Sequence, residues 1–176
     1  MKRISMLIGA LLLAAPAFGQ EIQQGMRKGS DDIRRFEMTF NPYTWSQLDS
    51  VNLHGGGGGV AYHLTKGFAI VGDFNLGKSS DDLEQEIFTF RAGPRFTARS
   101  GRTSVFGQIL VGGMHYRSVV DETEHGWSGG VGGGIDIGVN DYFTFRILQA
   151  EYLPIYFDHG PIHGARITMG FVFHMQ

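Results

Sequence analysis

The chain has 176 residues, of which 15 are basic, 17 are acidic and none is cysteine. The lack of cysteine excludes a disulfide framework and a thiolate metal centre, and the slight excess of acidic residues argues against nucleic-acid binding. Glycine and phenylalanine are both frequent (27 and 14) while proline is rare (5), which favours an ordered chain over a disordered one.

The amino terminus has the pattern of a secretory signal peptide. Lys2 and Arg3 precede an apolar run with no polar face, and Gly19 fits a cleavage site before Gln20. Cleavage there leaves 13 basic residues against 17 acidic ones. We therefore expect a signal peptide over 1–19, a periplasmic amino-terminal extension over 20–32 and an outer-membrane β-barrel domain over 33–176.

The rest of the chain alternates apolar with polar or small residues at a period of two, which is the pattern of a strand whose faces meet different surroundings. Near the carboxyl terminus, for example, Ile167, Met169 and Phe171 occupy every second position. The alternation predicts eight strands, over 33–41, 51–64, 68–77, 86–98, 103–116, 126–139, 143–156 and 163–175.

The predicted connections differ in length from one side of the sheet to the other. Those after the second, fourth and sixth strands are short, at 65–67, 99–102 and 140–142. Those after the first, third, fifth and seventh strands are longer and polar, at 42–50, 78–85, 117–125 and 157–162. Short periplasmic turns and longer external loops are typical of an outer-membrane barrel. The sequence therefore predicts an all-β fold, an eight-stranded antiparallel up-and-down transmembrane β-barrel.

Alternation alone does not decide which face of the barrel is inside, because a soluble barrel buries its apolar face and a membrane barrel exposes it. Predicted export, strands long enough to cross a tilted membrane path and aromatic residues near strand ends all favour the membrane barrel. The residues predicted to face lipid are Phe36, Phe40, Phe68, Phe88, Phe90, Phe96, Trp127, Phe143, Phe171 and Phe173. A soluble barrel that carries an apolar ligand remains the alternative.

The opposite face carries the charges, and an eight-stranded barrel is so narrow that side chains fill it. Charges in such an interior must pair, because an unpaired buried charge is costly. We therefore predict an interior salt-bridge network, with hydrogen bonds from Gln108 and threonines. Its predicted members are Glu37, Asp73, Arg91, Arg95, Asp136, Arg146 and Arg166.

Two further expectations concern the shape of this interior. Glycines on the inward register of the sixth strand should leave room beside Asp136 for long arginine side chains; they are Gly130, Gly132, Gly134 and Gly138. Arg146 and Glu151 are separated by an odd number of positions, so they share a face only if a β-bulge intervenes, and we expect one near Leu148-Gln149.

Three motifs suggest other chemistry. GDFNLGKS at 72–79 has the spelling of a phosphate-binding loop, but the acidic residues that follow and the lack of a helical stripe argue against ATP binding. GWSGG at 126–130, next to His125, fits a nucleophile elbow with Ser128, which keeps a lipid hydrolase as an alternative. His159 and His163 near Asp158 form a possible but nonspecific metal pair; we predict no metal site and no cofactor.

The whole pattern resembles the opacity-porin and outer-membrane-protein-A-type β-barrel family. The resemblance rests on the signal peptide, the alternating segments and the stretches GGGGGVAYHL, FTFRAGPRF, FGQILVGG and GGVGGGIDIGV. It implies location in the bacterial outer membrane, insertion by the barrel assembly machinery and a role in adhesion, surface interaction or envelope integrity. The ending FVFHMQ departs from the terminal aromatic usual in such barrels, and the periplasmic peptidoglycan-binding domain of some relatives is not expected here.

These observations together predict a protein that is not an enzyme and has a filled polar interior. Its expected partners are outer-membrane lipid, the barrel assembly machinery and an extracellular partner contacted through the loops, with no nucleic acid. The alternatives are an outer-membrane lipid hydrolase that uses Ser128 and His125, and a periplasmic ligand-carrying barrel.

Overall fold

The computed structural model describes residues 35–48, 51–79, 86–117, 124–157 and 160–175. The predicted signal peptide over 1–19 and extension over 20–32 lie outside the described residues. Among the described residues, no helix has the length and apolar character needed to cross a membrane.

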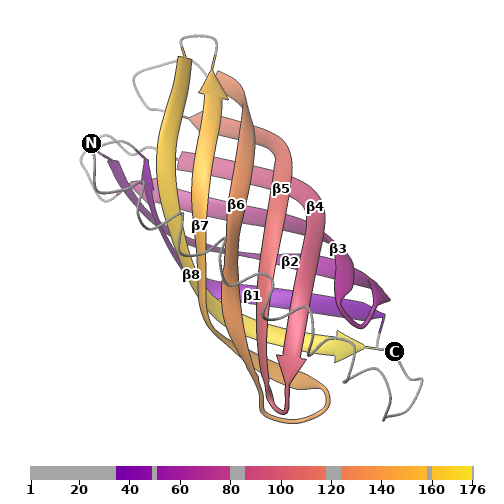
Figure 1. The fold of residues 1–176 in the computed structure, drawn as a ribbon. Helices are drawn as coiled ribbons and strands as arrows, with labels where there is room; N and C mark the ends of the chain where they lie inside the picture. The colour runs from indigo at the N-terminus through magenta and orange to yellow at the C-terminus, as the bar shows by residue number, and fades with distance from the viewer. Residues whose placement is uncertain (1–34, 49–50, 80–85, 118–123, 158–159, 176) are drawn as a thin grey trace, which may run out of the picture. The chain divides into compact units, whose positions relative to one another are not determined.

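The described residues form one closed barrel in which each strand pairs antiparallel with the next (Figure 1). The strands are β1 (Phe36–Leu48), β2 (Val51–Thr65), β3 (Phe68–Ser79), β4 (Glu86–Ser100), β5 (Thr103–Arg117), β6 (Glu124–Gly138), β7 (Phe143–Phe157) and β8 (Gly160–Met175). The predicted fold class and strand number are confirmed.

The barrel closes because β8 returns to pair with β1. The pairing runs from Phe36 opposite Met175 to Leu48 opposite Gly164. Closure leaves no row of unpaired backbone N–H and C=O groups, each of which would cost several kcal/mol in hydrocarbon.

Two β-bulges change which residues face inward. In β1, Pro42 and Tyr43 both point outward and together oppose a single residue of β2, so inward positions continue at Thr44. In β7, Ile147 and Leu148 are both exposed and the register shifts there, which confirms the bulge predicted near Leu148-Gln149. An extra residue of this kind reverses the parity of every position after it.

One end of the barrel, which we call the turn end, carries the short connections. Lys66-Gly67 and Gly101-Arg102 form two of them, and Gly101 has a φ of 59°, which glycine adopts without strain. In the third, the side-chain oxygen of Asn140 accepts hydrogen bonds from the backbone N–H groups of Tyr142 and Phe143, both at 2.9 Å.

The opposite end, the loop end, differs from the prediction. The expected loop over 42–50 is wrong, because β1 continues to Leu48 and β2 begins at Val51. The bulge accounts for the error, since a proline inside a strand is tolerated at a bulge. The expected loop over 157–162 is also wrong, because β8 begins at Gly160. For the loops predicted at 78–85 and 117–125, β3 ends at Ser79 and β5 at Arg117, and residues 80–85 and 118–123 lie outside the described residues.

Candidate functional site

The outer face of the barrel is apolar over most of its length, with polar side chains such as Lys78 and Glu86 near the loop end. Phe96 and Trp127 have 60 % and 69 % of their surface exposed, and many other large apolar side chains are exposed with them. The ten aromatic residues predicted to face lipid all lie on this outer face. Phe68, Phe143 and Phe171 are half-buried there because they pack on other rings, as Phe68 does on Phe96 at 5.1 Å. A surface this apolar is suited to acyl chains and unsuited to water.

The interior is lined by charged side chains. All seven residues predicted for the network lie there, and six of them are buried; Asp73 is partly buried, with 8 % of its side chain exposed. An eighth member is Glu151, which the bulge in β7 turns inward. It was not among the seven predicted members, although the expected bulge implied that it shares the inward face with Arg146. With it, four arginines face four carboxylates and the charges of the cluster balance.

Glu151 is the centre of the half of the network nearer the loop end. Its Oε2 accepts hydrogen bonds from Arg91 Nη2 at 3.0 Å and from Arg166 Nη2 at 2.5 Å. The same two nitrogens reach Asp73 Oδ1, at 2.7 and 3.0 Å. Two arginines from β4 and β8 are thus shared by two carboxylates from β3 and β7.

Glu37 and Asp136 form the half nearer the turn end. Arg95 Nη1 donates to Glu37 Oε1 at 2.6 Å, and Arg146 donates to both oxygens of Asp136 at 2.8 and 3.0 Å. His63 Nε2 lies 3.0 Å from the second oxygen of Glu37, and His63 is itself buried. His63 is a further interior residue that the sequence analysis did not select.

Two glutamines join the halves into one network. Gln108 accepts from Arg95 Nε at 2.9 Å and donates to Glu151 Oε1 at 2.6 Å. Gln149 accepts from Arg146 Nη1 and donates to Glu151 Oε1, both at 3.0 Å. The guanidinium groups of Arg95 and Arg146 also lie over the Phe106 ring, 4.7 and 4.4 Å from its centroid. Every charge therefore has a partner that offsets the cost of its burial.

The inward glycines of β6 provide the space for this network. A Cβ on Gly130 would lie 2.4 Å from Arg91 Nη1, so this glycine leaves room for an arginine as predicted. A Cβ on Gly132 would meet the Ala150 carbonyl oxygen at 2.2 Å, and one on Gly134 would meet the Phe106 ring at 2.7 Å. These two glycines therefore make room for close backbone approach and for an aromatic ring instead of arginines.

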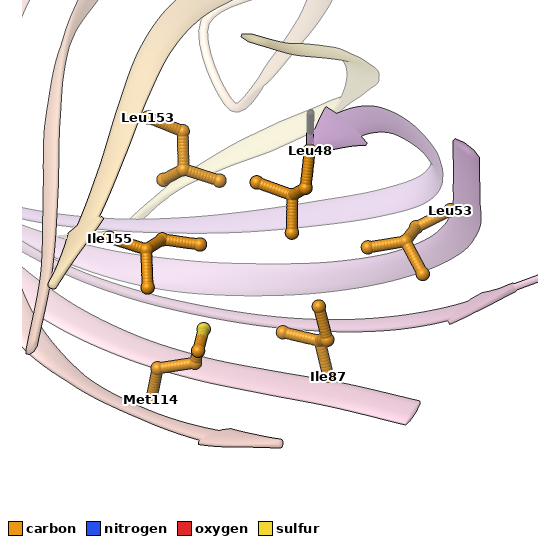
Figure 2. Close-up of a cluster of buried hydrophobic side chains, with 6 residues drawn as sticks. All are labelled: Leu48, Leu53, Ile87, Met114, Leu153 and Ile155. Atoms are coloured by element: carbon orange, nitrogen blue, oxygen red, sulfur yellow. The ribbon is translucent and has the colours of Figure 1, made fainter. Parts of the chain in front are cut away.

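An apolar cluster fills the interior close to the loop end, which the sequence analysis did not anticipate. Figure 2 shows its side chains pointing toward one another from five strands. The members are Leu48, Leu53, Ile87, Met114, Leu153 and Ile155. Leu53, Ile87 and Met114 could have been placed inside by alternation alone, whereas the inward direction of Leu48, Leu153 and Ile155 depends on the bulges that precede them in the chain.

The turn end of the interior is more open. A polar cavity of about 250 Å³ lies there, floored by the buried residues Glu37, Arg95 and Asp136 and rimmed by Arg99 and Arg102. Going from the turn end to the loop end, the interior is thus an open polar mouth, a neutral ionic network and an apolar cluster.

The structure separates the residues of the other candidate motifs. GDFNLGKS is extended strand within β3 and not the loop that would surround a phosphate. Ser128 is buried in the interior, whereas His125 is exposed on the outer face, so the proposed serine–histidine pair is wrong. His163 also lies on the outer face, where its Nδ1 is 2.5 Å from Tyr152 Oη, and His159 lies outside the described residues. The parts of the barrel that the structure describes contain no group of three or more metal-ligating side chains.

The barrel shares its fold with solved outer-membrane barrels. Neisserial surface protein A aligns with a TM-score of 0.64 at 8 % identity, covering 81 % of this chain and 98 % of that chain. The Yersinia pestis outer membrane protein Ail aligns at 0.51 and 16 % identity (80 % and 99 % covered). The N-terminal β-barrel domain of Pseudomonas aeruginosa OprF aligns at 0.50 and 14 % identity (80 % and 98 % covered).

No protein-family model matches the sequence, and no curated protein matches it either. Because the solved barrels share only 8–16 % of their residues with this chain, the likeness shows a common fold and does not extend to the partners of those proteins. The chain therefore has the fold of the eight-stranded β-barrels of bacterial outer membranes.

Proposed function

We propose that the protein is a non-catalytic bacterial outer-membrane barrel that supports the envelope or contacts partners at the cell surface. The observation that carries this proposal is the inverted barrel: a neutral ionic network inside a closed sheet and an apolar surface outside it. A periplasmic carrier would need the reverse arrangement, with an apolar interior and a polar exterior.

The interior supports a structural role over a transport role. A solute entering at the turn end meets a network in which Glu151 alone accepts hydrogen bonds from four side chains. Beyond it lies the apolar cluster that includes Leu153 and Ile155. Hydrophobic constrictions oppose ion passage because ions lose hydration there. We therefore expect a barrel that does not conduct.

The surface role rests on the loop end. Segments 78–85 and 117–125 have the sequences GKSSDDLEQ and RSVVDETEH with their flanks, and both are rich in acidic residues. We propose that they provide the contact with an extracellular partner, while outer-membrane lipid covers the apolar face and the barrel assembly machinery inserts the chain. Neisserial surface protein A, a surface protein with the same fold, supports a role of this class. Membership of the opacity-porin and outer-membrane-protein-A-type family remains part of this proposal.

The location is tested by expressing the full chain in a Gram-negative host and separating the membranes. We expect the protein in the outer-membrane fraction. Its gel migration should change on heating, because the folded barrel binds less detergent than the chain does after heat has unfolded it. Recovery as a detergent-free soluble protein would reject the membrane barrel. Purified protein in planar bilayers should give no steady conductance, and a stable ohmic channel would reject the closed interior.

The surface role is tested by replacing 80–85 and 118–123, separately and together, with glycine-serine segments of equal length. These variants should keep the heat-dependent gel shift, because the replaced residues lie between strands. We expect weaker binding of cells to host or bacterial surfaces in the double variant. The envelope role is tested by the detergent sensitivity of a strain from which the gene is deleted, which we expect to be raised. Unchanged cell binding in the double variant and unchanged detergent sensitivity in the deletion strain would together reject both proposed roles.

A further inference from the structure

Two histidines lie opposite each other on the outer face near the loop end. His115 of β5 and His125 of β6 are direct cross-strand partners, and both are exposed. Their ring centroids are 4.1 Å apart, with an angle of 72° between the rings. Side chains at such positions have Cβ atoms only about 4.5–5.5 Å apart, so the sheet itself holds the two imidazoles together.

The other two described histidines of this face have a different arrangement. His54 Nδ1 lies 3.4 Å from Tyr43 Oη, and His163 Nδ1 lies 2.5 Å from Tyr152 Oη. Each of these imidazoles thus lies beside a tyrosine hydroxyl. His115 and His125 instead form a contact between two identical metal-ligating groups.

We propose that His115 and His125 together bind a divalent transition ion such as Cu²⁺ or Zn²⁺ on the outer face of the barrel. Neutral imidazole is a preferred ligand of both ions. Bonds of about 2.0–2.1 Å from one zinc ion to two ring nitrogens require those nitrogens to lie within about 4.2 Å of each other. With ring centroids 4.1 Å apart, the two exposed imidazoles can reach this nitrogen–nitrogen separation by rotation about their side-chain torsions. Two nitrogens come from the protein, and water completes the coordination sphere.

The surroundings allow an ion to reach this pair from the loop end. His115 and His125 lie close to the last residue of β5, Arg117, and the first residue of β6. Arg117 is a nearby cation, and its cross-strand partner is Glu86, which also forms an ion pair with Lys78. The site needs no passage through the barrel interior, so this proposal does not depend on the closed interior or on the partner of the loops.

Trp127 provides a local optical probe of the site. It lies two positions after His125 on the same face of β6, and the chain has only one other tryptophan, Trp45. Bound Cu²⁺ quenches a neighbouring indole, so Cu²⁺ added to a Trp45→Phe variant reports binding through Trp127 alone. The same samples give an electron paramagnetic resonance spectrum whose nitrogen couplings count the imidazoles on the ion.

The experiment uses the full mature chain, folded in detergent micelles and titrated with CuSO₄ at neutral pH. We expect one ion per barrel with two coupled nitrogens, and loss of this species in His115→Asn and in His125→Asn. Even indirect partners of a metal site change affinity by about 10–100-fold, so removal of a direct ligand should weaken binding at least about tenfold. The control, His54→Asn with His163→Asn, should bind as the parent does.

A heat-dependent gel shift checks that each variant is folded. Saturable quenching with two coupled nitrogens in the parent and the control, lost in both single variants, supports the site. Binding that survives in either single variant, a spectrum with one coupled nitrogen, or loss of binding in the control overturns it. Failure here leaves the membrane fractionation unchanged, so the two proposals stand or fall separately.

Discussion

The charge balance of the barrel interior predicts a large effect from one isosteric change, Glu151→Gln. The substitution keeps the shape of the side chain but leaves four arginines facing three carboxylates. Removing one partner of a buried ion pair costs about 3–5 kcal/mol, because the remaining charge is left uncompensated. Asp73 still contacts Arg91 and Arg166 at 2.7 and 3.0 Å, so we expect the lower end, about 3 kcal/mol of unfolding free energy.

The assay is reversible urea unfolding of the barrel in lipid vesicles, followed by tryptophan fluorescence and by heat-dependent gel migration. Glu86→Gln is the matched control, because Glu86 forms an ion pair with Lys78 on the exposed outer face and its loss should leave unfolding unchanged. The double variant Glu151→Gln/Arg166→Gln restores three cations against three anions and should be less destabilised than the sum of its single variants. If Glu151→Gln unfolds within about 0.5 kcal/mol of the parent, as surface changes do, the network is not a source of stability and the reasoning fails.

Three further predictions use the same unfolding assay. Gly132→Ala should destabilise the barrel by about 1–3 kcal/mol, because the new Cβ would lie 2.2 Å from a backbone oxygen. Gly107→Ala is the control and should leave the stability unchanged, because the nearest atom to its new Cβ is 3.8 Å away. Equal effects of the two substitutions would contradict the close packing described around Gly132. Ile155→Ala should cost about 2–5 kcal/mol, since Ile155 is fully buried in the apolar cluster, and a cost near zero would mean that the cluster is loosely packed. Phe90→Arg should cost about 2–4 kcal/mol in lipid vesicles if the middle of β4 faces hydrocarbon, and an unchanged stability would show that this face is not in the membrane.

The sequence by itself determined the class of fold and the two faces of the barrel. A period of two over many short segments allows only strands, and predicted export with exposed aromatic positions favours a membrane barrel over a soluble one. The placement of Phe90 outward and Arg91 inward follows directly from this alternation. The need for charge pairing was also predictable from the sequence, since a narrow interior cannot hold isolated charges.

The tertiary structure decided everything that depends on register. A bulge inserts one residue and reverses the faces beyond it. The spacing of Arg146 and Glu151 indicated a bulge in β7, but only the structure placed the extra residue at Ile147-Leu148 and so turned Glu151 and Leu153 inward. The bulge at Pro42 likewise turned an expected loop into strand. Which arginine meets which carboxylate depends on how far each strand is shifted against its neighbour, as when Arg166 of β8 reaches Asp73 of β3. Local alternation contains no information about that shift, because closure of the sheet sets it for all the strands at once.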